Sequence, residues 1–194
     1  RSELGMTGFT RTGSGPRSAA CSRVQCASST AMPPSLPPPS LIRKALSGPQ
    51  KGERGVDGHK QITGIKRHIL TCSLGFVLAV LVTPANVHDT QAAGPLLDRA
   101  AEQGWAPKRV KVDGIYTGER MDAAAARHDL DVQVSTRPPE VKGFTPLPIR
   151  WRIERTFGTQ TNHYRRLTCN LEQSAPAAEN AVEIANFHRV LKVY

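Results

Sequence analysis

The stretch KRHILTCSLGFVLAVLVT, residues 66–83, decides the fold class. Its first part, residues 66–73, predicts a strand, and Phe76–Thr83 predicts a second strand. The second strand is rich in β-branched residues and apolar on both faces, which is typical of a buried central strand. The short link Ser73-Leu74-Gly75 favours a hairpin between the two.

Helical and extended patterns alternate after this hairpin. The spacing predicts helices over residues 89–103, 117–128, 149–167 and 175–190, short strands over 109–112 and 131–135, and room for one more strand before Lys66. This order predicts an α/β fold in which helices cover a mixed sheet.

Composition narrows the possible functions. The chain has 194 residues, and 26 Lys and Arg against 16 Asp and Glu give a net charge of +10. Such a surplus favours a polyanionic partner, nucleic acid before an anionic membrane. No apolar run reaches the roughly 18 residues that span a bilayer, so no membrane association is expected. The four cysteines form no CxxC pair, so we expect neither a zinc site nor a disulfide framework, and a cytoplasmic protein.

Residues 1–49 differ in composition from residues 50–194. Residues 1–50 contain seven prolines and nine serines, and they lack the apolar content that would offset the entropy cost of ordering. We therefore predict a disordered basic N-terminal tail over 1–49 and one globular domain over 50–194. The tail is interpreted either as a solvated segment or as a basic DNA-binding arm.

Two carboxylates are candidate site residues. Asp113 follows the strand 109–112 and precedes Gly114, and ligands gather at the carboxyl ends of strands in open α/β sheets. Glu154 lies in a predicted helix next to Arg150 and Arg155. Alternatively, Asp113 is an ordinary turn former, and Arg150 and Glu154 are a surface pair one helical turn apart. A divalent cation takes oxygen ligands from several elements, which favours a shared site.

Three motifs resemble those of one family: GERGVDGHKQITGIKRHIL at 52–70, VDGIYTGE at 112–119 and RWRIERTFG at 150–158. Together they resemble DDE-type bacterial insertion-sequence transposases of the insertion-sequence-four/five superfamily, over about residues 50–190. The resemblance implies an RNase H-like fold, with Asp113 as the second and Glu154 as the third catalytic acid.

The same resemblance implies the chemistry and the partners. Three acids would hold two Mg²⁺ or Mn²⁺ ions that support cleavage of double-stranded DNA at the element ends and transfer into target DNA, by a homodimer bound to DNA. Basic residues near the motifs are the candidate phosphate contacts: Lys60, Lys66, Arg67, Arg150, Arg155, Arg165 and Arg166.

The chain departs from the family pattern at the first acid. The family carries an aspartate in a first-strand segment reading IRDSQS, and the comparable segment here is LIRKALS, residues 41–47, with Lys44 at the aspartate position. Asp57, the nearest acid downstream, is a weak alternative ligand. The sequence thus predicts a transposase, either active or reduced to a DNA-binding remnant. An RNA-binding structural protein also fits the charge, but it leaves the motifs unexplained.

Overall fold

Strand β3 (Ile62–Thr71) organises one half of the sheet. Strand β1 (Ser40–Ser47) pairs antiparallel along one of its edges. Along the other edge, β2 (Gly55–Asp57) pairs first and β4 (Val77–Pro84) follows, both antiparallel. The predicted hairpin between β3 and β4 is confirmed, and Gly75 makes its turn with a φ of +80°, a conformation that glycine adopts without strain.

The other half of the sheet is parallel. Strand β5 (Arg109–Asp113) pairs parallel with β1, and β6 (Asp131–Ser135) pairs parallel with β5. The main strand order is therefore β4-β3-β1-β5-β6, with β1 at the centre. This mixed sheet flanked by helices is consistent with the RNase H-like fold that the sequence predicted.

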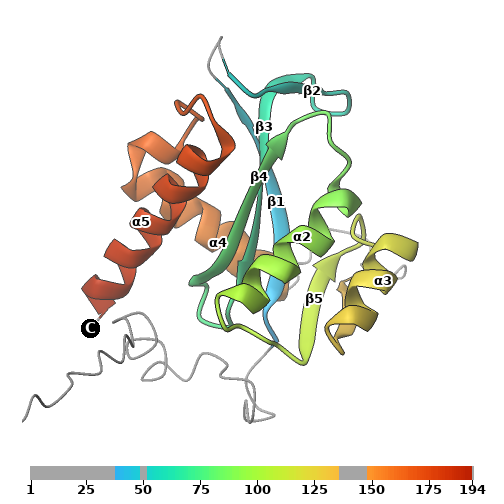
Figure 1. The fold of residues 1–194 in the computed structure, drawn as a ribbon. Coiled ribbons are helices and arrows are strands. Elements are labelled where there is room, and N and C mark those ends of the chain that lie inside the picture. The colour runs from blue at the N-terminus through green and yellow to red at the C-terminus, as the bar shows by residue number, and fades with distance from the viewer. Residues whose placement is uncertain (1–37, 49–51, 136–147, 194) are drawn as a thin grey trace, which may run out of the picture.

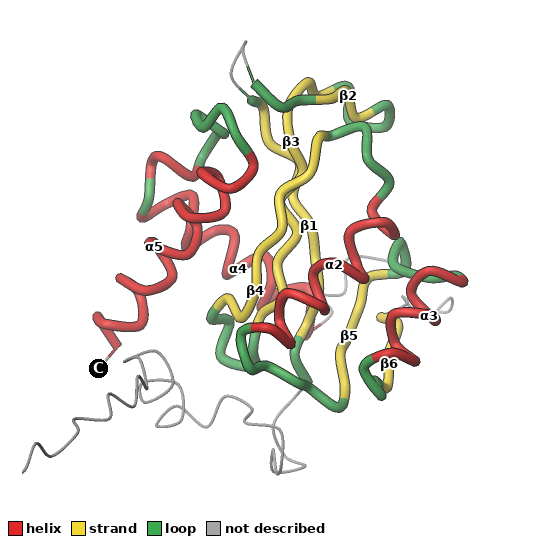
Figure 2. Tube along the Cα trace, viewed as in Figure 1, coloured by secondary structure: helices red, strands yellow, loops and turns green. Residues whose placement is uncertain are grey.

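Helices cover both faces of the sheet (Figure 1). Helices α2 (Asp89–Glu102) and α3 (Glu119–Arg127) lie on one face, called here the α2/α3 face. Helices α4 (Pro148–His163) and α5 (Ala175–Val193) cover the other, the α4/α5 face. Figure 2 shows the same layers by element type.

Each face has its own apolar core, because side chains alternate along the strands. On the α2/α3 face, Leu41 of β1 packs with Leu96 of α2 and Met121 of α3. On the α4/α5 face, Ile69 of β3 packs with Phe157 of α4 and Val182 of α5, with Ile42 against them. Neighbouring residues of β1 therefore pack into the cores on opposite faces of the sheet.

Strand β4 lies at an edge of the sheet, so the prediction of a central strand is wrong. Its burial comes from helices, whose side chains also hydrogen-bond its free edge. Asn186 of α5 accepts from the Val77 N–H and donates to its carbonyl, each at 2.9 Å, and Glu179 accepts from the Val82 N–H at 2.9 Å. Covering an edge strand in this way prevents it from pairing with another chain.

The computed structural model describes residues 38–48, 52–135 and 148–193. Residues 40–47, assigned from composition to the disordered tail, form β1, so that part of the prediction is wrong. The tail predicted over residues 1–37 lies outside the described residues.

The other element boundaries mostly agree with the prediction. The helix expected over 149–167 instead ends at His163, and a short 3₁₀ helix, η1, covers Arg165–Leu167. The strand expected at 66–73 begins earlier, at Ile62, and ends at Thr71.

Candidate functional site

Asp113 ends β5 on the α4/α5 face. Val110 and Val112 are buried in the core of the α2/α3 face, and alternation directs the next side chain to the opposite face. The Asp113 side chain is exposed there, and its Oδ1 accepts the N–H of Gly114 at 2.8 Å. The strand end thus presents a carboxylate to solvent.

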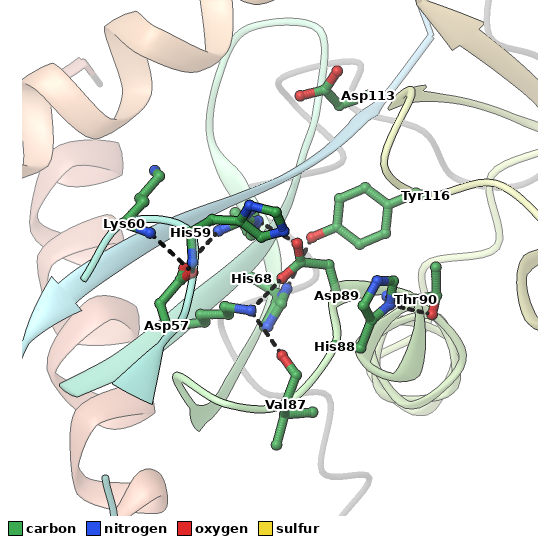
Figure 3. A network of polar contacts seen from close by, with 12 residues as sticks. Asp57, His59, Lys60, His68, Val87, His88, Asp89, Thr90, Asp113 and Tyr116 are labelled. Atoms are coloured by element: carbon green, nitrogen blue, oxygen red, sulfur yellow. Dashed lines mark hydrogen bonds and ion pairs between the residues drawn. The ribbon is translucent and has the colours of Figure 1, made fainter. Parts of the chain in front are cut away.

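Tyr116 anchors the turn that carries Asp113 (Figure 3). Its N–H donates to the Asp113 carbonyl at 2.9 Å, and its buried hydroxyl lies 2.8 Å from His68 Nδ1. His68 Nε2 in turn lies 3.0 Å from Thr83 Oγ1. Burial, reinforced by the charges of Lys66 and Arg43, lowers the pKa of His68 to about 3. A neutral imidazole therefore links the β5 turn to β3 and β4.

Glu154 lies near the start of α4, one turn before Phe157, and is exposed. Two neighbours fix this helix on the sheet: Phe157 packs in the α4/α5-face core, and Thr156 Oγ1 donates to the Gly75 carbonyl at 3.0 Å. Asp113 and the helix that carries Glu154 therefore occupy the same face.

The β1 residue that follows the last β1–β5 pair is Ile42. Leu41 and Val112 form that last pair of the parallel register, and the residues that follow them on the two strands are Ile42 and Asp113. Ile42 packs against the α4/α5-face core. The position where an acid would complete the pair is therefore apolar.

Lys44, the residue predicted to replace the first acid, lies on the same face but two residues further along β1, about 7 Å at strand spacing. Its Nζ lies 5.8 Å from the centre of the Phe157 ring. Burial lowers the pKa of Lys44, and the charges of Arg67 and Lys60 add to this effect. Within the described residues, no group of three His, Cys, Asp or Glu side chains could hold a metal ion.

Comparison with known proteins identifies the family. The family model described as "Transposase DDE domain" matches residues 31–185. The chain belongs to the DDE transposase family. It is also 31% identical over 119 residues to the Burkholderia cepacia protein named "Putative transposase for insertion sequence element IS402", an alignment covering 58% of this chain and 56% of that protein. This transposase chain thus spans about half the length of the curated relative it matches.

Asp57 of the transposase lies in a buried ionic cluster on the α2/α3 face. Asp57 is 3% exposed, and its Oδ2 lies 3.4 Å from Arg43 Nη1. Arg43 Nε also contacts Asp89 at 2.5 Å, and Lys66 Nζ lies 3.2 Å from that carboxylate. The structure does not bring Asp57 to the face of Asp113.

The pKa of Asp57 reflects these contacts. Burial alone would raise it, but the backbone N–H groups of Lys60 and His59, with the charges of Lys66 and Arg43, lower it below its usual value. A carboxylate held by two N–H groups and an arginine is a structural anion. The sequence analysis did not identify Arg43 and Asp89, its partners in the cluster, because nothing in their local sequence distinguishes them from surface charges.

The residues predicted to contact phosphates fall into a buried and an exposed group. Lys66 and Arg67 are buried: Lys66 donates to the Val87 carbonyl at 2.8 Å, and Arg67 donates to the Leu167 carbonyl at 3.3 Å. Burial lowers the pKa of Arg67 to about 10. These two cations hold the transposase fold together and cannot reach DNA. The exposed members are Lys60, Arg155, Arg165 and Arg166, and the side chain of Arg150 lies outside the described residues.

Within the described part of the chain, no helix is both long enough and apolar enough to cross a bilayer.

Proposed function

We propose that this chain is an insertion-sequence transposase domain that binds double-stranded DNA but does not cleave it. The observation that carries the proposal is that β1 contains no carboxylate: the residue that follows its last pair with β5 is the apolar Ile42. The cation site of this family takes three acids, and Asp113 and Glu154 supply only two. No cleavage step is therefore assigned to this chain.

The charge distribution supports DNA binding. The net charge of +10 accompanies exposed Lys60, Arg155 and Arg165. Arg166 is also exposed, but its Nε lies 2.7 Å from Glu172 Oε1, so we rank it below Arg165. Cations of this kind bind phosphates without reading bases. The DNA would be the ends of an element and its target, held by a homodimer in the cytoplasm at the nucleoid.

The electrostatics of the α4/α5 face oppose a metal ion. Lys44 and buried Arg67 both lie on this side of the sheet, and the lowered pKa of Lys44 reflects their mutual repulsion as well as burial. A divalent cation would meet the same repulsion. Only two negative charges, those of Asp113 and Glu154, offset this repulsion. We infer that Mg²⁺ occupancy is low at cellular concentrations.

Fluorescence anisotropy with a labelled duplex tests the binding half of the proposal. The logarithm of the association constant should fall linearly with the logarithm of salt concentration, with a slope of about −0.9 for each phosphate contacted. Arg165→Ala should weaken binding to all sequences alike and reduce that slope by about one contact. Lys108→Ala is the matched control, because Lys108 is exposed but pairs with Asp129 at 2.7 Å. A flat salt response would contradict the proposal.

A further inference from the structure

Helix α5 carries an apolar stripe on its outer side. Ile184, Phe187 and Leu191 are 69%, 52% and 59% exposed. The opposite side of the helix, with Val182 and Ala185, is buried against the sheet. Three large apolar side chains aligned on one exposed helix face mark an interaction surface.

The spacing of the stripe is that of a helix pair. Residues 184, 187 and 191 follow one another at intervals of three and four, the pattern of a and d positions in paired helices. In this register Asn180 and Ala177 continue the stripe toward the start of α5. The pattern therefore suits another helix better than an irregular segment.

An apolar groove runs beside the stripe. It has a volume of about 500 Å³ and is lined by α5 and by the chain after α4, including Ala177, Ala181, Ala185, Tyr164 and Leu167. Ile184 and His188 form its border with the stripe. The molecule thus presents a protruding ring, Phe187, and a recess on the same helix, which is the condition for a self-complementary surface.

We propose that the stripe is covered by α5 of a second copy, in a parallel pair about a two-fold axis along the helix. In a parallel pair, a d residue leans toward the partner's e position. This places Phe187 near His188 of the second copy, at the border of its groove. An antiparallel pair would turn the two grooves toward each other and leave Phe187 outside both.

Charge favours the same arrangement. Glu183 and His188 occupy the g and e positions, and a parallel pair brings g of one helix beside e of the other, five residues further on. His188 Nδ1 lies 3.0 Å from the Tyr164 hydroxyl. Donation from that hydroxyl leaves the Nε2–H to donate to the Glu183 carboxylate of the second copy. Each pair forms twice in the dimer.

The expected dimer is weak. An α-helix of 19 residues is about 28 Å long, so the pair buries less than the roughly 800 Å² per partner of a standard interface. We therefore expect a dissociation constant in the micromolar range.

Sedimentation equilibrium of the full chain without DNA tests the proposal separately from DNA binding. The wild type should shift from monomer to dimer between about 1 and 200 µM, around a dissociation constant of roughly ten micromolar. Phe187→Glu should remain monomeric, because it places a charge in the stripe, between the paired helices. Leu171→Glu is the matched control: Leu171 is 59% exposed but lies outside α5, so its dimerisation should equal that of the wild type. Circular dichroism checks that each variant is folded.

A charge exchange tests the parallel register. Glu183→Lys and His188→Glu should each weaken the dimer by about threefold to tenfold, and the double variant should recover most of this loss. Failure to recover would overturn the register. A wild type that is monomeric throughout, or a Phe187→Glu variant that dimerises normally, would overturn the proposal itself. Cross-links from α5 to another segment of the same chain in a monomer would also do so.

Discussion

Leu41 of β1 pairs with Val112 of β5 in the parallel register of the sheet, and Ile42 and Asp113 are the residues that follow them on the two strands. Strand β1 therefore offers an aliphatic side chain, and no acid, after its last pair with the strand that carries Asp113. The absence of a carboxylate on β1 is the structural basis for expecting DNA binding without cleavage.

An acid at position 42 should create cation affinity. Ile42→Asp should strengthen Mn²⁺ binding by at least about tenfold, equivalent to 1.4 kcal/mol, because it adds a charge beside Asp113. Lys44→Asp should have a smaller effect, since its position lies two residues away. Titration followed by Mn²⁺ electron paramagnetic resonance measures both, with Ile42→Asn as the uncharged control. Equal affinity of Ile42→Asp and Ile42→Asn would show that position 42 does not face the acids.

Loss of the Tyr116 hydroxyl should loosen the turn that carries Asp113. Tyr116→Phe leaves His68 Nδ1 without its partner in a buried site, which costs about 1–3 kcal/mol of unfolding free energy. Urea denaturation measures the loss. Thr117→Val serves as the comparison, because the Thr117 hydroxyl is exposed and bonds only the nearby Gly114 carbonyl; it should change stability by less than about 0.5 kcal/mol. Equal effects of the two changes would contradict a special role for Tyr116.

Stability should fall as the solution becomes acidic, because of His68. Its pKa is about 3 in the folded chain and about 6.5 when unfolded. Above pH 6.5, His68 is neutral in both the folded and the unfolded chain. Between these two values only the unfolded chain takes up the proton, so the unfolding free energy should fall by up to about 1.4 kcal/mol per pH unit.

Urea denaturation from pH 7 to pH 4 measures this slope. His68→Gln keeps hydrogen-bonding capacity but cannot take up the proton, so its slope should be smaller by about one proton. Identical slopes in the two proteins would mean that His68 is protonated normally in the folded state.

Removing one anion from the buried ionic cluster should be costly. Asp89 is 2% exposed and contacts both Arg43 and Lys66. Asp89→Asn should lower the unfolding free energy by about 3–5 kcal/mol, because the buried Lys66 and the half-buried Arg43 lose a charged partner. Asp129→Asn removes a surface partner of Lys108 and should leave the melting temperature close to that of the wild type. Thermal denaturation compares them, and similar melting temperatures would refute a structural role for the cluster.

Sequence patterns predicted the elements whose buried residues recur at strand or helix spacing. The β3–β4 hairpin and α2 were predictable because their apolar residues recur at strand or helix spacing. Asp113 and Glu154 were identified by motif, and the structure leaves both side chains exposed. Composition assigned residues 40–47 to the tail because SLIRKALS follows a proline run, and its apolar residues alternate between the two cores.

Contacts between distant segments were beyond such patterns. Lys66 and Arg67 were interpreted as surface cations, since charged residues are rarely buried without a partner. Their partners, Asp89 and the Leu167 carbonyl, lie 23 and 100 residues away along the chain. The apolar residue beside Asp113 required the register of two strands, which the segment at 41–47 alone does not specify.

Nicking of supercoiled plasmid DNA in Mg²⁺ or Mn²⁺ tests the central claim most directly. The wild-type chain should nick no faster than its Glu154→Gln variant, because β1 supplies no carboxylate. Ile42→Asp should raise nicking above that background only while Glu154 is present. Robust nicking by the unmodified chain that is lost in Glu154→Gln would contradict the account and require a first acid elsewhere.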